Sequence, residues 1–372
     1  MVKPQRRTTA WTLAWLCVLV IVYASLYPFE DWRNQEIAPW SFIDAPWPKH
    51  FSSFDVWSNV LGYAPLGFWL SLAALRSGLG RIPSLLLAWL VSCALSLAME
   101  SLQSFLPVRV PSSVDWLCNT LGGLLGGLLA IVLERRGWLY HWAQFRRQWL
   151  TPDASASLVL MALWPLALLF PVSVPLGLGQ VLERLRASLL QDFPGWQWLQ
   201  QIPPDGFFQT LSPRMELVCV ALGLMVPALL GLSAVRHLNQ RLKVVLAVVV
   251  MAALANCLSA ALTYGPEHAL FWFNPQVFGG LAVGALLSLL AIKLSSRWIL
   301  ALMLLAQLLL LMWVNQLNTS AYFAQTLQTW EQGRFIRFHG LTQWLNWLWP
   351  WAVLVWGVVR WLMPKTHRQT RT

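Results

Sequence analysis

Two stretches of this chain repeat one pattern, SSFDVWSNVLGYAPLG at residues 52–67 and SSVDWLCNTLGGLLGG at residues 112–127. Each stretch begins with two serines, continues with an acid and an amide, and ends in glycines. The shared positions are Ser52/Ser112, Ser53/Ser113, Asp55/Asp115, Asn59/Asn119, Leu61/Leu121, Gly62/Gly122 and Gly67/Gly127. Serines cap helix N-termini, the helix dipole favours an acid in the first turn, and small residues four apart let membrane helices approach closely. The repeat therefore predicts two equivalent helices that begin with the same polar turn.

The chain around the repeat is too apolar for a soluble protein. Of its 372 residues, 57% are hydrophobic and only 11% are charged, whereas soluble domains carry about 25% charged residues. Runs such as LLLAWLVSCALSLAM at 85–99 are typical of helices that cross the hydrocarbon core, which takes about 20 apolar residues. We predict an all-α polytopic transmembrane bundle with spans at roughly 10–28, 56–75, 82–105, 114–133, 154–173, 215–235, 242–263, 269–292, 297–317 and 341–363.

The distribution of basic residues predicts the orientation of these spans. Lys and Arg accumulate in cytoplasmic loops, and most of the 26 basic residues fall on one side of the predicted bundle. These are Lys3, Arg6, Arg7, Arg76, Arg81, Arg135, Arg136, Arg146, Arg147, Arg236, Arg241, Lys243, Lys293, Arg297, Arg360, Lys365, Arg368 and Arg371. Both termini are therefore predicted to be cytoplasmic. The net charge of +11 is mainly this topological signal, and its scatter among short loops argues against a nucleic-acid partner.

A basic segment, ERRGWLYHWAQFRRQWLTPD at 134–153, divides the chain. Its aromatic residues among four arginines are typical of a helix that lies in the membrane interface. We predict a four-helix transmembrane domain at 1–135, a cytoplasmic basic linker at 136–153, and a six-helix transmembrane extension at 154–372. Residues 174–213 are expected to form a long outer loop.

Several residue types are explained by the membrane itself. The 25 tryptophans indicate an aromatic belt at the lipid headgroups, with aromatic platforms for a sugar or lipid as the alternative. All five cysteines lie in predicted spans, so we expect neither a disulfide nor a cysteine metal site. The N-terminal apolar region is longer than the 7–15 residues usual in signal peptides, and we interpret it as an anchor.

Polar side chains collect around the repeat at the predicted outer ends of the spans. Glu100 lies inside the outer end of the third span, and Gln103 follows one turn later. Ionisable groups inside the membrane indicate function by default, and a short loop brings Arg109 back toward Asp115. The predicted rim consists of Glu100, Gln103, Arg109, Asp115 and Asn119 with Lys49, Asp55 and Asn59 from the other copy. The alternative is a buried ion-pair lattice that only holds four helices together.

These residues carry a resemblance to a known family. The pattern Glu100-x-x-Gln103, Arg109, Asp115-x-x-x-Asn119-x-x-Gly122-x-x-x-Gly126, preceded by Asp55-x-x-x-Asn59 and Pro65-Leu66-Gly67, resembles the VanZ-like bacterial membrane proteins over about residues 10–135. The ending GRFIRFHGLTQWLNWLWP at 333–350 is similar to that of longer members. The resemblance implies a multi-pass protein of the bacterial plasma membrane. It also implies a role in the cell envelope, since the family is named after a component of low-level teicoplanin resistance.

The first functional hypothesis is binding of an anionic, lipid-linked envelope component at the outer leaflet. Arg109 and Lys49 would hold a phosphate with the amides of the helix N-termini. Asp55 and Asp115 would orient these cations or hold a divalent metal, although no ligand motif indicates a metal. Gln103, Asn59 and Asn119 would add neutral hydrogen bonds. Protein partners are not predictable from these residues.

The second hypothesis is an enzyme that uses the same rim. Glu100 would act as general acid or base, and Arg109 would stabilise developing charge, with Asp115 as a further catalytic candidate. The sequence contains no activated nucleophile. Arg337 and His339 would reach the cavity from the second half. A structural accessory protein is the third class, and a transporter is disfavoured because the polar residues gather at one face.

Overall fold

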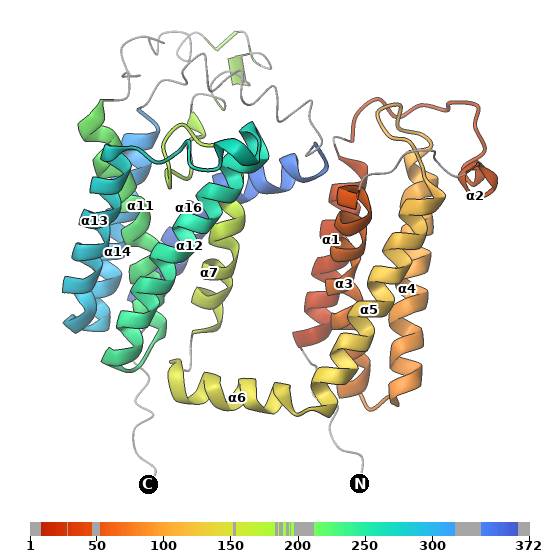
Figure 1. The fold of residues 1–372 in the computed structure, drawn as a ribbon, viewed down its shortest axis with the longest axis horizontal. Helices are drawn as coiled ribbons and strands as arrows, with labels where there is room; N and C mark the ends of the chain where they lie inside the picture. Colours follow the sequence, from red (N-terminus) through yellow and green to blue (C-terminus); the bar gives the residue numbers. More distant parts are fainter. Residues whose placement is uncertain are drawn as a thin grey trace. The chain divides into compact units, whose positions relative to one another are not determined.

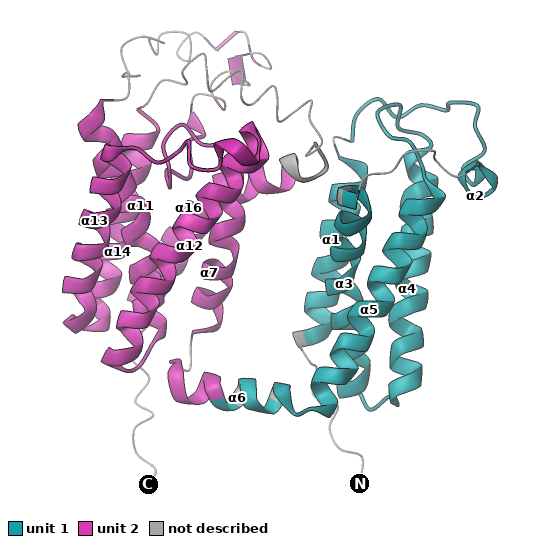
Figure 2. Cartoon of the chain, viewed as in Figure 1, with its two compact units in different colours: residues 1–144 teal, residues 145–372 magenta. Residues whose placement is uncertain are grey.

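The computed structural model describes the chain as helices arranged in two compact units, residues 1–144 and 145–372 (Figures 1 and 2). The boundary between the units falls inside the predicted linker 136–153. The described residues are 9–27, 29–46, 53–151, 154–182, 212–316 and 336–363, with 185, 189, 190, 193, 195 and 196. Within them the model contains no strand beyond an isolated bridge between Leu150 and Val235. The all-helical class predicted from the sequence is confirmed.

The first unit is a four-helix bundle with a short outer helix. Each of its four predicted spans corresponds to a helix, and α6 begins after a turn in which Gly137 has a φ of +69°. The elements are α1 (Thr9–Leu26), α2 (Ser41–Asp44), α3 (Ser53–Arg76), α4 (Arg81–Gln103), α5 (Ser113–Arg135) and the start of α6 (Trp138–Trp149).

The two copies of the repeat form the closest helix pair of this unit. A Cβ atom on Gly122 would collide with the carbonyl oxygen of Val60, and one on Gly126 would collide with that of Ala64. Because both numbers increase together, α3 and α5 run parallel. Without side chains, these glycines let the two backbones touch. The repeat thus builds the axis of the unit, and α1 and α4 pack against it (Figure 1).

The second unit is built around α11, the most buried of the apolar helices in the described chain. Leu224, Leu229 and Leu230 of α11 are fully buried, and glycines of α13 pack against its backbone. The elements are α7 (Ser155–Ala167), α11 (Pro213–Ala234), α12 (Leu238–Tyr264), η1 (Pro266–His268), α13 (Pro275–Leu290), η2 (Ala291–Lys293), α14 (Ser296–Val314) and α16 (Ile336–Leu362).

The segment after α7 differs from its predicted course. The span predicted at 154–173 is helical only to Ala167, and the following irregular segment is buried in the core, with Val174, Leu176 and Leu178 at most 1% exposed. Prolines 165, 171 and 175 disfavour continued helix. Asn315 accepts from the backbone of Val181 at 2.9 Å, so asparagine side chains satisfy this buried backbone. The first part of the predicted outer loop 174–213 is therefore core structure.

Seven helices of the described chain are long and apolar enough to cross a membrane, namely α3, α4, α5, α11, α12, α13 and α14. The apolar parts of α1 and α7 are shorter, and α16 has 27 residues without reaching the same hydropathy. The protein is thus a polytopic membrane protein. The count of ten spans and the cytoplasmic termini stay predictions.

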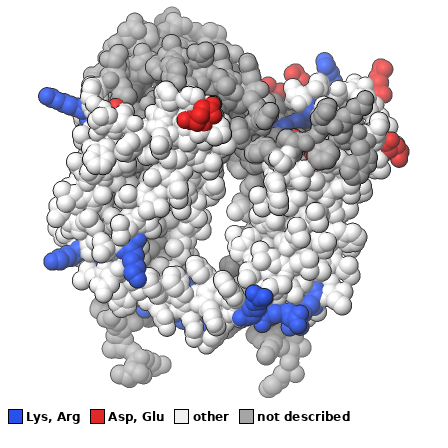
Figure 3. All heavy atoms as spheres, in the orientation of Figure 1, with Lys and Arg blue, Asp and Glu red and all other residues white. Residues whose placement is uncertain are grey.

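In Figure 3 the acidic residues in view lie toward one end of the helices, whereas basic residues occur at both ends of each unit. In the first unit, Arg76 ends α3, Arg81 begins α4 and Arg135 ends α5. In the second, Glu216 lies in the first turn of α11, and Arg241 lies in the first turn of α12. The arginines at these helix ends are among those on which the predicted orientation rests.

Candidate functional site

The predicted rim residues within the described chain gather at one end of the first unit. Asp55 and Asn59 begin α3, Glu100 and Gln103 end α4, Arg109 lies in the loop, and Asp115 and Asn119 begin α5. Lys49 lies outside the described residues. Arg337 and His339 belong to the first turn of α16, but their side chains are likewise outside the description.

A hydrogen bond joins the two copies of the repeat at this end. Asn59 Nδ2 donates to Asp115 Oδ1 at 2.8 Å. The Ser112 side chain caps α5 by accepting from the backbone N–H of Asp115 at 3.4 Å, as the sequence predicts. The amino ends of two parallel helices therefore lie side by side. Each such end carries about half a positive charge. The equivalent Asp55 is exposed, so the two copies are not equivalent in their surroundings.

Glu100 is a buried acid with a defined partner. Its side chain is 3% exposed, and its Oε2 accepts from the backbone N–H of Ser112 at 2.9 Å. A carboxylate at a helix start satisfies an N–H that has no partner within the helix. Glu100 thus ties the end of α4 to the beginning of α5.

One buried polar atom at this end of the unit has no hydrogen-bond partner. Asn119 is 5% exposed, its Nδ2 donates to Ser96 Oγ at 3.0 Å, and its Oδ1 accepts no bond. Tyr63 is 4% exposed, and its hydroxyl interacts with Ser96 and Glu100. Buried polar groups nearly always have a partner, so an exception such as Asn119 Oδ1 marks a place where water or a ligand completes the bonding.

The sequence hypotheses missed Tyr63, Ser96 and Ser112. Tyr63 stands four residues after Asn59, and Ser96 stands four before Glu100. Residues four apart share a helix face, so this spacing is the signal that identifies them. One turn deeper on α4, Ser92 is fully buried, and its hydroxyl lies where Gly123 leaves room.

Arg109 and Gln103 bind the end of α1. Arg109 Nη2 donates to the carbonyl oxygens of Tyr27 at 2.8 Å and Ala24 at 3.3 Å, and Gln103 Nε2 donates to Ser25 O at 3.0 Å. The last carbonyls of a helix lack intrahelical partners, and positive charge is favourable there. This part of the rim therefore also caps α1.

The groups at the rim that could bind a ligand are the half-buried guanidinium of Arg109, the buried amide of Asn119 and the buried carboxylate of Glu100. The described residues contain no group of three His, Cys, Asp or Glu side chains placed to hold a metal ion. The Tyr63 hydroxyl interacts electrostatically with Glu100.

Comparison with known proteins finds a family match for this unit. The family model VanZ/LLP1 matches residues 8–134, which include Glu100, Arg109 and both copies of the repeat. No curated protein and no solved structure matches the chain. The second unit lies outside the family match. Residues 8–134, which make up most of the first unit, are therefore similar to the VanZ/LLP1 family of membrane proteins.

Proposed function

We propose that the rim of the first unit binds the headgroup of an anionic, lipid-linked envelope component, and that this binding affects susceptibility to teicoplanin-type glycopeptides. The observation that carries the proposal is the buried oxygen Asn119 Oδ1, which accepts no hydrogen bond. A ligand that fills this place must donate a hydrogen bond to the amide oxygen.

The surroundings add a preference for negative charge. Two helix amino ends meet at the Asn59–Asp115 hydrogen bond, and Arg109 keeps a guanidinium at the same end of the unit. Helix amino ends and arginine are common phosphate partners. Glu100 repels an anion, so we place the phosphate toward Arg109 and a hydroxyl-bearing group toward Asn119. A lipid-linked sugar phosphate combines these two chemistries.

Binding tests the proposal directly with the full chain in lipid nanodiscs. The probes are a polyprenyl phosphate, a polyprenyl-phosphate sugar and the neutral polyprenol. We expect Arg109→Gln to weaken both phosphorylated probes about tenfold, as loss of a charge-assisted hydrogen bond does. Asn119→Leu should weaken only the sugar-bearing probe. Arg33→Gln, the same change at an exposed arginine outside the rim, is the matched control. Well-folded variants that bind all probes like the wild-type chain refute the proposal.

Cellular complementation links binding to phenotype. Glu100→Gln, Arg109→Ala and Asp115→Asn are compared at equal protein abundance for glycopeptide susceptibility, in a strain in which the wild-type chain has an effect. Normal protein abundance with loss of the phenotype supports a functional role of the rim residues. Loss of the protein itself supports the structural accessory role, because Glu100 and Arg109 both satisfy helix ends.

An enzyme is the second candidate, favoured by one observation. Glu100 is buried near the Tyr63 hydroxyl, an arrangement suited to general acid–base chemistry. Chromatography of the lipid probe after incubation distinguishes the two functions. A changed product that disappears in Glu100→Gln indicates an enzyme, and unchanged probe indicates a binding protein.

A further inference from the structure

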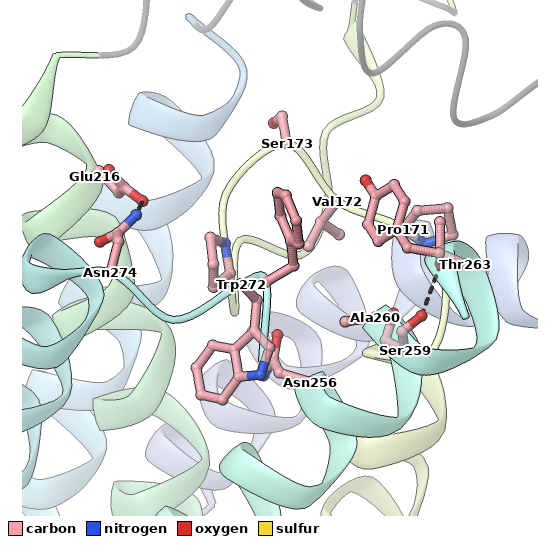
Figure 4. A pocket seen from close by; sticks show the side chains of 13 residues that line it. Pro171, Val172, Ser173, Glu216, Asn256, Ser259, Ala260, Thr263, Trp272 and Asn274 are labelled. Atoms are coloured by element: carbon pink, nitrogen blue, oxygen red, sulfur yellow. Dashed lines mark hydrogen bonds between the residues drawn. The ribbon is translucent and has the colours of Figure 1, made fainter. Parts of the chain in front are cut away.

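The second unit contains a partly open cavity of about 220 Å³ that is independent of the rim (Figure 4). Its walls come from four places: the irregular segment after α7, the first turn of α11, the last three turns of α12, and the loop before α13. At about 30 Å³ per water molecule, the cavity has room for about seven waters. It therefore suits one small polar group rather than a long chain.

The side-chain donors around this cavity are largely engaged with the protein itself. The hydroxyl of Ser173 donates to Gln180 Oε1 at 2.6 Å, that of Ser259 to Leu169 O at 3.1 Å, and that of Thr263 to Ser259 O at 2.7 Å. The indole N–H of Trp272 points to Cys257 Sγ at 3.4 Å. Toward a ligand, these groups can therefore act mainly as hydrogen-bond acceptors.

The side-chain N–H groups of the two asparagines in the cavity also donate to the protein itself. Asn256 is 5% exposed, and its Nδ2 donates to Ala252 O at 2.8 Å, which leaves its oxygen as the atom offered to the cavity. Asn274 Nδ2 donates to Glu216 Oε1 at 2.8 Å, while Asn274 Oδ1 caps α13. Figure 4 shows Asn256 beside the Trp272 indole and Asn274 directed at Glu216.

The charge of the lining is negative and its faces are aromatic. Glu216 is its acid, and none of the thirteen described lining residues is Lys, Arg or His. Arg214, two residues earlier, is exposed and does not line the cavity. The aromatic residues Tyr264, Phe271 and Trp272 also line the cavity, and the faces of aromatic rings attract organic cations.

We propose that this cavity binds an ammonium group. A carboxylate and aromatic rings complement the positive charge of any ammonium group. The amide oxygen and hydroxyl lone pairs also accept from the N–H groups of a primary ammonium, and together these groups disfavour phosphate. A divalent metal is a poorer match, since metals such as Ca²⁺ prefer several carboxylate oxygens and the cavity has one carboxylate. The ammonium group belongs either to a lipid headgroup or to a soluble amine.

The experiment measures equilibrium binding of choline and ethanolamine to the full chain in detergent. The uncharged probe 3,3-dimethylbutan-1-ol, which has the shape of choline, is the control ligand. We expect saturable binding of at least one ammonium probe, and affinity at least about tenfold lower for the uncharged probe, the difference expected from a charge-assisted contact. Equal binding of charged and uncharged probes, or no binding of either ammonium probe, overturns the proposal.

Two acids at the same end of the unit provide matched variants. Glu216→Gln keeps an oxygen to accept from Asn274, so the fold should survive, but it removes the charge; we expect at least about tenfold weaker binding. Glu267→Gln changes an acid whose side chain is 69% exposed and which does not line the cavity; binding should persist. Equal affinity of Glu216→Gln and the wild-type chain overturns the assignment of this site.

Nanodiscs then distinguish the two sources of the ammonium group. If the ligand is a lipid, phosphatidylethanolamine should compete with choline and phosphatidylglycerol should not. If the ligand is a soluble amine, neither lipid should compete. Competition by phosphatidylglycerol alone contradicts the proposed charge of the site.

Discussion

Arg109 illustrates how a side chain at a polar rim can serve two purposes. The sequence predicts a phosphate-binding cation at this position, and its contacts with Ala24 and Tyr27 make it a cap for α1 as well. Arg241 plays a similar capping role in the second unit, where its Nη1 donates to Ile292 O at 2.6 Å. A guanidinium has several donors in a rigid fork, so it can close a helix end while keeping its charge near a ligand.

Removal of the Arg109 side chain should loosen the end of α1. We expect Arg109→Ala to reduce the free energy of unfolding by about 1–3 kcal/mol, because hydrogen bonds with charged groups are lost. Arg109→Lys should reduce the free energy of unfolding less than Arg109→Ala does, because lysine keeps the charge but lacks the forked set of donors of the guanidinium. Thermal unfolding and hydrogen exchange of residues 20–27 measure the effect. Arg33→Ala, at an exposed arginine, is the control and should stay within about 0.5 kcal/mol. Unchanged exchange in Arg109→Ala would argue against the cap.

At the scale of the element, the parallel contact of α3 and α5 depends on glycines that differ between the repeat copies. Gly122 faces the backbone of Val60, whereas nothing lies within 4 Å of a Cβ on the equivalent Gly62. The two positions are identical in the sequence pattern. Their surroundings differ because one copy uses this face for the helix contact and the other does not.

This difference supplies a matched pair of substitutions. We expect Gly122→Ala to destabilise the protein by about 1–3 kcal/mol, since the added methyl group overpacks the contact. Gly62→Ala should be neutral or stabilising by up to about 1 kcal/mol, because alanine is the better helix former. Unfolding midpoints in detergent compare the two. Equal effects of both substitutions would show that the parallel contact is wrong.

At the scale of the whole molecule, the two units provide different chemistries. The first unit presents helix amino ends and a guanidinium, and the second unit presents an acidic cavity lined by aromatic residues. The family match ends at residue 134, so knowledge of the family does not extend to the cavity. The proposed ligands of the two units carry opposite charges, and each proposal can fail without the other.

The orientation of the chain is testable by cysteine labelling. In a background without the five native cysteines, we expect Glu267→Cys to react with an impermeant maleimide added to intact cells. Arg297→Cys should react only after the membrane is opened. Both positions are exposed in the structure, so protection reports the membrane side rather than burial. The reverse pattern would place the termini outside, contrary to the distribution of basic residues.

The sequence alone determined the membrane class, the helical fold and the end of the first unit at which polar residues gather. Long apolar runs, caps and the repeat are properties of neighbouring residues, and local patterns suffice to predict helices from them. Even here one element was partly mispredicted, since the buried segment after α7 depends on asparagines more than 130 residues away.

Only the tertiary structure decided which polar groups meet. The contact of Arg109 with Tyr27 joins residues 82 apart, and that of Asn59 with Asp115 joins residues 56 apart. The unpartnered Asn119 oxygen and the acceptor-rich cavity likewise arise where several helices converge. A buried polar atom without a hydrogen-bond partner indicates a place for a ligand or water. Whether such an atom finds a partner depends on packing between segments that are distant in the sequence.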